Sequence, residues 1–301
     1  MRPDVSVVIV AHGGGDLVRR ALRALARDPS PPTREIIVVD SGAPGGPAGW
    51  LRAERPDVLL IEPGENLGFG AANNRGIARS SGRYVLLLNP DAFVDEGCLG
   101  ELVRFLEAHP SAVAVGPRLR FGDGRLQRSC RGFPSVFRVA TEYLGLRALR
   151  RSSPRLNGFY CGGFEHDRAR PVEWLTGACL LVRGVPLREA GGFDEAFFLY
   201  SEEVDLLRRL HDDGGETWFD PAAGAVHLWG GVTSNAPGAA FREQLRSHVR
   251  YLHKHSGPLA AHAVRLVLLA GLVLRAPRDA GYREAFRWLA TRDVDALLAG
   301  E

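Results

Sequence analysis

The first 118 residues alternate short apolar runs with amphipathic stretches of helix length, and this alternation limits the fold more than any other feature. The apolar runs predict strands at residues 5–11, 35–40, 58–62, 84–89 and 112–116. The stretches between them predict helices at 16–27, 70–80 and 96–108. Strands separated by helices of this length are typical of βαβ units. We therefore expect an α/β protein with a mostly parallel central sheet flanked by helices.

The pattern changes after residue 118. Gly122-Asp123-Gly124 predicts a hairpin turn. Residues 129–170, rich in Arg, Gly, Pro and Ser, predict a long and partly mobile loop near the site. Regular patterns resume at 174–183 and continue to the C-terminus. They predict a helix at 202–212, a strand near 225–229 and helices at 238–254, 259–275 and 280–290.

These patterns predict two domains. A catalytic domain spans residues 1–235, with halves of about 1–118 and about 119–235, and a helical extension spans 236–301. A composition of 45% hydrophobic and 24% charged residues excludes a disordered or fibrous chain. The net charge of +3 gives no argument for a nucleic-acid partner.

The cysteines and the apolar runs bear on the cellular compartment. Four cysteines stand singly, without a Cys-x-x-Cys pair, which fits a reducing cytosol. The apolar run at residues 5–11 has no cleavage site after it and is expected to be a buried strand. The run Leu266 to Leu274 has nine residues, whereas crossing a bilayer needs roughly 20. No transmembrane helix is predicted.

Polar residues follow several of the predicted strands. Asp40, Asn66, Asn89 and Asp91 lie at or just after strand ends, the edge where open α/β sheets bind ligands. The glycines of segment 65–76 would let backbone N–H groups approach a phosphate at a helix start. That segment is not a dinucleotide fingerprint, which would need glycine at position 73. Helix caps and plain turns explain the same residues without any ligand.

Three further segments carry groups suited to metal binding and base catalysis. Pro90 ends its strand and turns out Asp91, a carboxylate suited to a hard divalent cation. His227, at a strand end before a glycine- and hydroxyl-containing stretch, could add a second ligand, although a lone histidine is more often structural.

The third segment contains Glu202, Glu203 and Asp205, which open a predicted helix after an aromatic run. An apolar wall raises a carboxylate pKa and makes the group a usable base. The favourable helix dipole is the alternative reason for acidic residues at this position.

Taken in order, five segments resemble the family 2 glycosyltransferases with the GT-A fold, from about residue 4 to about residue 250. They are similar above all to the bacterial rhamnosyltransferase-like branch. The segments read ENLGFGAANNRGI, LLLNPDA, WLTGACLLVR, GGFDEAFFLYSEEVDLLRRL and HLWGGVTS. The chain differs from the family pattern in two places. Asn89 stands where the family usually has the first Asp of Asp-x-Asp, and Glu203 stands where the base is usually Asp.

The resemblance implies a role for each matching residue. Glu203 would be the base, with Glu202 beside it, and Asp91 and His227 would hold Mg²⁺ or Mn²⁺. The acceptor would be bound by Trp174, Thr176, Gly177 and Asp205. The nucleotide-sugar donor would be bound by Ala11, Asp40, Asn66, Gly68, Gly70, Asn73, Asn89 and Asp91.

The resemblance also implies an activity. It is an inverting transfer of a sugar, with dTDP-rhamnose as the first donor to test, to a glycan or lipid-linked acceptor in cell-surface polysaccharide synthesis. Two alternatives stay open from the residues alone. A nucleotidyltransferase would usually carry a glycine-rich loop with a nearby Lys after the first strand, and residues 12–16 have none. A non-catalytic nucleotide-sugar-binding protein would not need Glu202, Glu203, Asp91 and His227 together.

The expected C-terminal helix at 259–275 has a broad apolar face, interrupted by His262 and Arg265. Arginines follow it at positions 275, 278, 283 and 287. Such a helix can lie in an anionic membrane interface without spanning it. That interpretation places the protein in the cytoplasm, at the inner face of the plasma membrane. The alternative is packing on the catalytic domain or on a second copy of the chain as a homo-oligomer.

Overall fold

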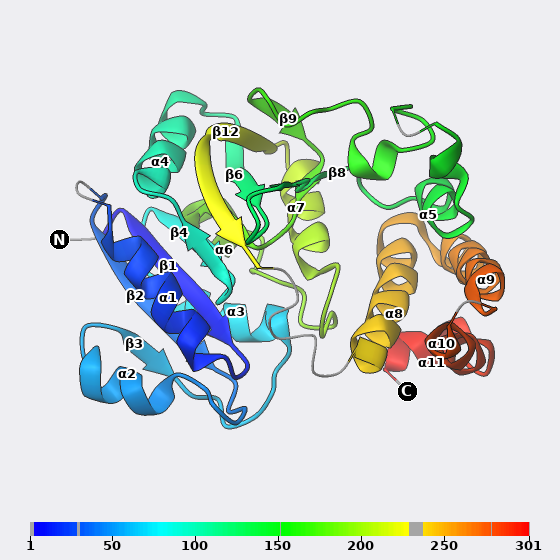
Figure 1. Ribbon diagram of the computed structural model, residues 1–301, viewed down its shortest axis with the longest axis horizontal. Helices are drawn as coiled ribbons and strands as arrows, with labels where there is room; N and C mark the ends of the chain where they lie inside the picture. Colours follow the sequence, from blue (N-terminus) through cyan, green and yellow to red (C-terminus); the bar gives the residue numbers. More distant parts are fainter. Residues whose placement is uncertain (1–2, 29–30, 151, 229–236, 278, 301) are drawn as a thin grey trace. The chain divides into compact units, whose positions relative to one another are not determined.

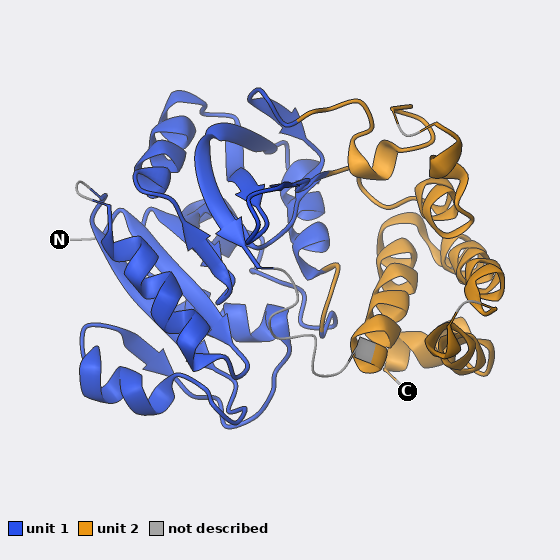
Figure 2. Ribbon diagram, viewed as in Figure 1, with its two compact units in different colours: residues 1–130, 166–198, 202–232 blue, residues 131–165, 199–201, 233–301 orange. Residues whose placement is uncertain are grey.

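The computed structural model describes residues 3–28, 31–150, 152–228, 237–277 and 279–300. The chain forms two compact units (Figure 2). Unit 1 comprises residues 1–130, 166–198 and 202–232, and unit 2 comprises 131–165, 199–201 and 233–301. The predicted domain boundary at 235/236 lies outside the described residues, and so do Trp229 to Ser234 of the last motif. The division into residues 1–235 and 236–301 stays a prediction.

A sheet of ten strands forms the centre of unit 1 in the described part of the chain (Figure 1). Eight strands lie in the order β3-β2-β1-β4-β11-β6-β12-β5, while β7 pairs with β6 and β9 with β12. The β1–β2, β1–β4, β2–β3 and β6–β12 pairs are parallel, and the remaining pairs are antiparallel. The strands are β1 (Val5–Ala11), β2 (Arg34–Asp40), β3 (Leu59–Ile61), β4 (Tyr84–Leu88), β5 (Ala92–Val94), β6 (Ala112–Arg120), β7 (Leu126–Gln127), β9 (Arg170–Val172), β11 (Cys179–Arg183) and β12 (Glu216–His227). Two short strands lie outside this sheet, β8 (Cys130–Arg131) and β10 (Trp174–Leu175).

Helices cover both faces of this sheet. Successive side chains of a strand point to opposite faces. Val7 of β1 belongs to a core cluster with residues of α1 (Gly15–Ala26) and α4 (Cys98–Ala108). On the other face, a Cβ at Gly76 of α3 (Phe69–Arg79) would lie 2.4 Å from Val8 Cγ1, so glycine lets α3 approach β1 closely. The remaining helices of unit 1 are α2 (Ala48–Glu54), α6 (Gly184–Glu189) and α7 (Glu202–Asp212). The predicted α/β class and doubly covered sheet are confirmed.

The predicted hairpin at Gly122-Asp123-Gly124 is also confirmed. The N–H of Phe121 donates to the carbonyl oxygen of Arg125 at 2.9 Å, and β6 and β7 pair antiparallel on either side of the turn. The strand expected near 225–229 is the end of the longer β12. Short elements were missed, among them α2 and β5, because seven and three residues are too few to show a period.

The prediction of a long loop over residues 129–170 is wrong at its centre. Residues Val136–Tyr143 form α5, which begins where Ser135 Oγ accepts the N–H of Arg138 at 3.2 Å. Val139 and Tyr143 are buried in unit 2. A Cβ at Gly271 of α9 would lie 2.8 Å from Tyr143 Cβ, so α5 crosses α9 at very short range. The helix was missed because the many Arg, Gly and Pro residues of the segment outweigh the short apolar pattern of α5.

Unit 2 is otherwise built from α8 (Pro237–Ser256), α9 (Pro258–Arg275), α10 (Ala280–Ala290) and α11 (Val294–Ala299), with short 3₁₀ turns η1 (Leu146–Leu149) and η2 (Gly158–Tyr160). The three expected C-terminal helices are present, and α11 was missed. Helix α9 has 18 residues and a mean hydropathy of 1.6, so by length and composition alone it could cross a membrane. The expectation of no transmembrane helix counted only the nine residues from Leu266 to Leu274, whereas the helix that contains them has 18. Core helices of soluble proteins meet the same criterion, and one face of α9 is buried.

Candidate active site

Ala11 and Asp40 lie side by side at the carboxyl edge of the sheet, as predicted. They are partners in the β1–β2 ladder, and Ser41 N–H donates to Ala11 O at 2.8 Å. The buried Asp40 carboxylate accepts the N–H of Gly42 at 3.1 Å and that of Ala48 at 3.0 Å. Asp40 therefore shapes its own loop, the alternative considered above for such residues. A donor contact by Ala11 or Asp40 stays a prediction.

Gly68 and Gly70, at the start of α3, let the loop that contains Phe193 and Phe198 approach the helix closely. The N–H of Phe69 donates to the carbonyl oxygen of Phe198 at 2.9 Å, and a Cβ at Gly68 would lie 2.4 Å from that oxygen. Gly70 lies against Phe193 in the same way, where a Cβ would be 3.2 Å from Phe193 Cβ. The Phe69 N–H therefore already has a protein partner, and the phosphate cradle expected at these glycines stays a prediction. A donor contact by Gly68 or Gly70 stays a prediction.

Three asparagines fix this region. Asn66 Oδ1 accepts the N–H of Gly68 at 3.1 Å, and buried Asn73 donates to Phe69 O at 2.9 Å within α3. Asn74, which the sequence analysis did not single out, accepts the N–H of Phe193 at 2.8 Å and donates to its carbonyl oxygen at 2.9 Å. Asn74 thus ties α3 to the loop before the acidic helix. The donor roles of Asn66 and Asn73 stay predictions.

Glu202 and Glu203 open α7, as predicted. Burial and the neighbouring Glu203 charge raise the pKa of Glu202 well above its ordinary range. Glu203 lies against Gly177, where a Cβ would be 3.3 Å from Glu203 Cβ. Tyr200 and Ser201, which precede the pair, both have φ of 66°, a left-handed conformation that costs about 1–3 kcal/mol per non-glycine residue. The backbone therefore enters α7, and with it the acidic pair, through an unusual turn at Tyr200 and Ser201.

The other residues assigned to the acceptor have structural partners. Asp205 is fully buried and accepts from Arg209 Nε at 2.8 Å. Arg209 in turn donates to carbonyl oxygens of the loop after α6. Thr176 donates its N–H and its hydroxyl to Ser129 O at 3.1 and 3.2 Å, and Trp174 is buried. Acceptor binding by Trp174, Thr176, Gly177 and Asp205 stays a prediction.

Asp91 and His227 meet at the sheet edge, although 136 positions separate them in the sequence. His227 is the partner of Ala92 in the β5–β12 ladder, and its Nε2 lies 3.2 Å from Asp91 Oδ1 and 3.4 Å from Asn89 Nδ2. His227 Nδ1 lies 2.9 Å from Gln127 Oε1. Gln127 was missed because nothing in the sequence near it points to a histidine 100 positions away.

These residues fit a divalent cation. In the tautomer that donates its Nδ1–H to Gln127 Oε1, His227 can offer Nε2 as a metal ligand beside Asp91 Oδ1 and Asn89. His227 Nε2 and Asp91 Oδ1 lie 3.2 Å apart, close enough for one cation to bind both atoms. Asn89 Oδ1 is a buried acceptor with no hydrogen-bond partner. The described residues contain no cluster of three His, Cys, Asp or Glu side chains. Mg²⁺-type sites need only one or two carboxylates, because waters and substrate phosphates supply the other ligands.

Comparison with known sequences gives consistent matches. The family model described as glycosyl transferase family 2 matches residues 6–165. The N-acetylglucosaminyl-diphospho-decaprenol L-rhamnosyltransferase of Mycobacterium tuberculosis is 31% identical over 287 residues, which is 91% of this chain and 92% of that protein. The rhamnosyltransferase WbbL of Escherichia coli is 25% identical over 82% of this chain and 92% of its own length.

Solved structures share the fold. GalNAc-T7, crystallised with UDP, GalNAc and Mn²⁺, superposes with a TM-score of 0.61 at 15% identity, over 83% of this chain and 48% of its own. The mannosyltransferase PcManGT of Pyrobaculum calidifontis, in complex with GDP-Man and Mn²⁺, gives 0.57 at 19% identity, over 99% of this chain and 86% of its own.

Proposed function

Because the chain belongs to glycosyl transferase family 2, we propose that it performs a metal-dependent, inverting transfer from a nucleotide-sugar donor to an acceptor hydroxyl. The observation that carries this proposal is the pair Glu202–Glu203. Burial of Glu202 and the charge of the neighbouring Glu203 raise the pKa of Glu202, so Glu202 is the member of the pair that we assign as protonated and Glu203 the one that we assign as the base. Glu203 is thus a carboxylate that can accept a proton, beside the glycine of the predicted acceptor segment.

The proposed transfer is a single displacement. The acceptor oxygen forms a bond to the anomeric carbon as the bond to the diphosphate oxygen breaks, and the hydroxyl proton passes to Glu203. Asp91, His227 and Asn89 would hold Mg²⁺ or Mn²⁺. When bound, such a cation neutralises the charge that develops on the departing diphosphate. The crystallisation of two fold relatives with Mn²⁺ supports this assignment.

The mycobacterial relative supports rhamnose as the sugar and a lipid-linked saccharide as the acceptor, in cell-surface polysaccharide synthesis. We infer a dTDP or UDP donor, with dTDP-rhamnose first. Calorimetry with dTDP-, UDP- and GDP-sugars tests this inference. Binding of a GDP-sugar together with no binding of either pyrimidine nucleotide would contradict it.

One assay separates the classes of activity. The protein is incubated with dTDP-rhamnose, with and without a lipid-linked N-acetylglucosaminyl acceptor and Mn²⁺, and the products are resolved by chromatography. We expect dTDP release that needs Mn²⁺ and rises with acceptor. Formation of a nucleotide sugar from a nucleoside triphosphate and a sugar phosphate would instead indicate a nucleotidyltransferase. Tight binding without turnover would indicate a binding protein.

We further propose that the exposed face of α9 meets the inner face of the plasma membrane, which places the protein in the cytoplasm. Leu259, Leu266 and Val273 are 85%, 63% and 52% exposed and follow one side of the helix. Arg283 and Arg287, both exposed on α10, add positive charge that suits an anionic surface. Sedimentation with anionic vesicles should retain the protein at low salt, and Leu266→Gln should weaken retention. A stable dimer in light scattering, with no vesicle binding, would assign the face to a second copy of the chain.

A further inference from the structure

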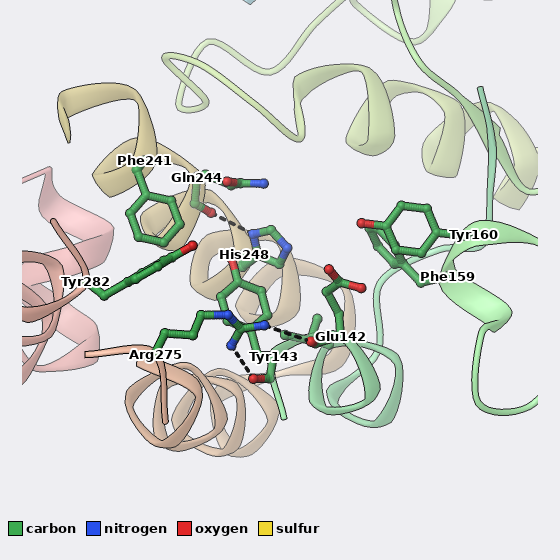
Figure 3. Close-up of a pocket in the computed structure, with 10 residues that line it drawn as sticks. Glu142, Tyr143, Phe159, Tyr160, Phe241, Gln244, His248, Arg275 and Tyr282 are labelled. Atoms are coloured by element: carbon green, nitrogen blue, oxygen red, sulfur yellow. Dashed lines mark hydrogen bonds between the residues drawn. The ribbon is translucent and has the colours of Figure 1, made fainter. Parts of the chain in front are cut away.

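Unit 2 contains a pocket that the proposed chemistry does not use. The cavity measures about 190 Å³ and lies among residues of α5, α8, α9, α10 and η2 (Figure 3). Two pairs of aromatic rings lie on either side of His248. Phe159 and Tyr160 pack edge to face with ring centroids 5.1 Å apart, and Phe241 and Tyr282 do so at 5.8 Å. The pocket therefore has an aromatic wall on each side.

Hydrogen-bond acceptors lie between these walls. His248 is buried, and its Nδ1 donates to the carbonyl oxygen of Gln244 at 2.6 Å, so Nε2 carries a lone pair. Burial lowers the pKa of His248, so the ring is neutral near neutral pH. The Glu142 carboxylate, paired at 2.6 Å with Arg147 and hydrogen-bonded to the Tyr160 side chain, has further lone pairs for a ligand.

The cation that lines the pocket is committed to the protein. Arg275 donates to the carbonyl oxygens of Glu142 and Gly271 at 3.1 Å each, and to that of Tyr143. These bonds fasten the C-terminal end of α5 to α9. The pocket thus offers a ligand aromatic rings and acceptors, while the Arg275 guanidinium is used by the backbone and those of Arg131 and Arg147 lie over the Tyr160 ring at 4.6 and 4.8 Å.

This lining selects among ligand classes. A phosphate would meet the Glu142 charge, and a prenyl chain would bury the acceptors of Glu142 and His248 without partners, which costs free energy. A neutral ring that donates several hydroxyl hydrogens and has apolar faces satisfies both parts of the lining. The cavity has the volume of about six water molecules, which suits one sugar ring.

We propose that this pocket binds one pyranose ring of the acceptor saccharide. The proposal rests on the proposed function, because a glycan acceptor is what supplies such a ring. It assigns part of acceptor recognition to unit 2, in residues that lie outside every motif of the sequence analysis.

Two variants of the full chain test the pocket. Glu142→Gln removes the acceptor charge, and Tyr282→Leu removes one aromatic wall. Glu284→Gln, an exposed residue on α10, is the matched control for loss of a carboxylate. For both pocket variants we expect the acceptor KM to rise about tenfold or more, with kcat and acceptor-free hydrolysis of the donor unchanged. Saturation-transfer NMR with free N-acetylglucosamine, L-rhamnose and D-galactose should give a signal that both variants lose and the control keeps.

The outcomes separate this inference from the proposed function. Thermal melts identify which variants are folded. If folded Glu142→Gln or Tyr282→Leu keeps both the acceptor KM and the saccharide signals of the wild type, the pocket inference is overturned. If the wild type turns over no nucleotide sugar, yet binds free monosaccharides in a way that the pocket variants lose, the pocket stands and the proposed function falls.

Discussion

Replacing Gly68 with alanine should lower the free energy of unfolding by about 0.5–4 kcal/mol. Gly68 has φ of 80° and ψ of 174°, a conformation that is essentially confined to glycine and costs other residues about 1–3 kcal/mol. The new Cβ would also lie 2.4 Å from Phe198 O and 2.7 Å from Phe198 Cδ2. The loop must therefore move, which breaks the Phe69–Phe198 hydrogen bond, worth about 0.5–1.5 kcal/mol. Alanine also restricts the unfolded chain more than glycine does, and this effect stabilises the folded state by roughly 0.4–1 kcal/mol.

Gly64→Ala is the matched control. Gly64 has φ of 83°, but nothing lies within 4 Å of its Cβ position, so the variant carries backbone strain without the clash. Urea denaturation followed by circular dichroism measures both variants. Gly68→Ala should be less stable than Gly64→Ala by about 1 kcal/mol or more, and it should also lose transferase activity, because the displaced loop leads to Glu202. Equal losses of stability in the two variants would refute the contact between α3 and Phe198.

Three more outcomes are expected. Glu203→Gln should lower turnover by about 10²-fold or more while calorimetric donor binding is kept; a normal Glu203→Gln beside an inactive Glu202→Gln would move the base to Glu202. Because folding raises the pKa of Glu202, the stability that its proton contributes is complete below the unfolded pKa and is lost as the pH rises through the folded pKa. Glu202→Gln should remove that loss. Urea denaturation from about pH 5 to about pH 9 measures the free energy of unfolding of this variant and of the wild type. Between the unfolded and the folded pKa of Glu202, the variant should gain roughly 1.4 kcal/mol over the wild type for each pH unit. A difference that does not change with pH would argue against a protonated Glu202. Excess EDTA, or Asp91→Ala, should abolish transfer, and full turnover under either condition would exclude a metal at Asp91.

The sheet could be predicted because its central strands consist of consecutive apolar residues. Residues 5–11 and 84–88 are buried throughout, so almost every position had to be apolar, and the run lengths matched the strands closely. Helix α5 could not be found in this way. One of its faces packs on α9, more than 100 positions further along the sequence, and an exposed Phe137 on the helix blurs the contrast between its buried and its exposed residues.

The candidate site divides along similar lines. Asp91 and His227 were both chosen from strand ends, and the register of β5 and β12 brings them together. The partners of these groups were not predictable. Gln127 becomes relevant only once β7 is folded against β6, and Asn74 looks no different from Asn73 until α3 shows which face meets Phe193. A polar side chain that hydrogen-bonds a loop cannot be distinguished, from the sequence alone, from one that binds a ligand.

The crossing of α5 and α9 sets a limit on shortening the chain. A version that ends at residue 235 would keep α5 but lose α8, α9 and α10. Val139 and Tyr143, which are 1% and 8% exposed in the whole protein, would then face water. Such a fragment is expected to aggregate or to be degraded, although it contains all of residues 6–165, which match the family model. A soluble minimal enzyme would have to lose 131–165 together with the C-terminal helices, with a short linker joining the two cut ends.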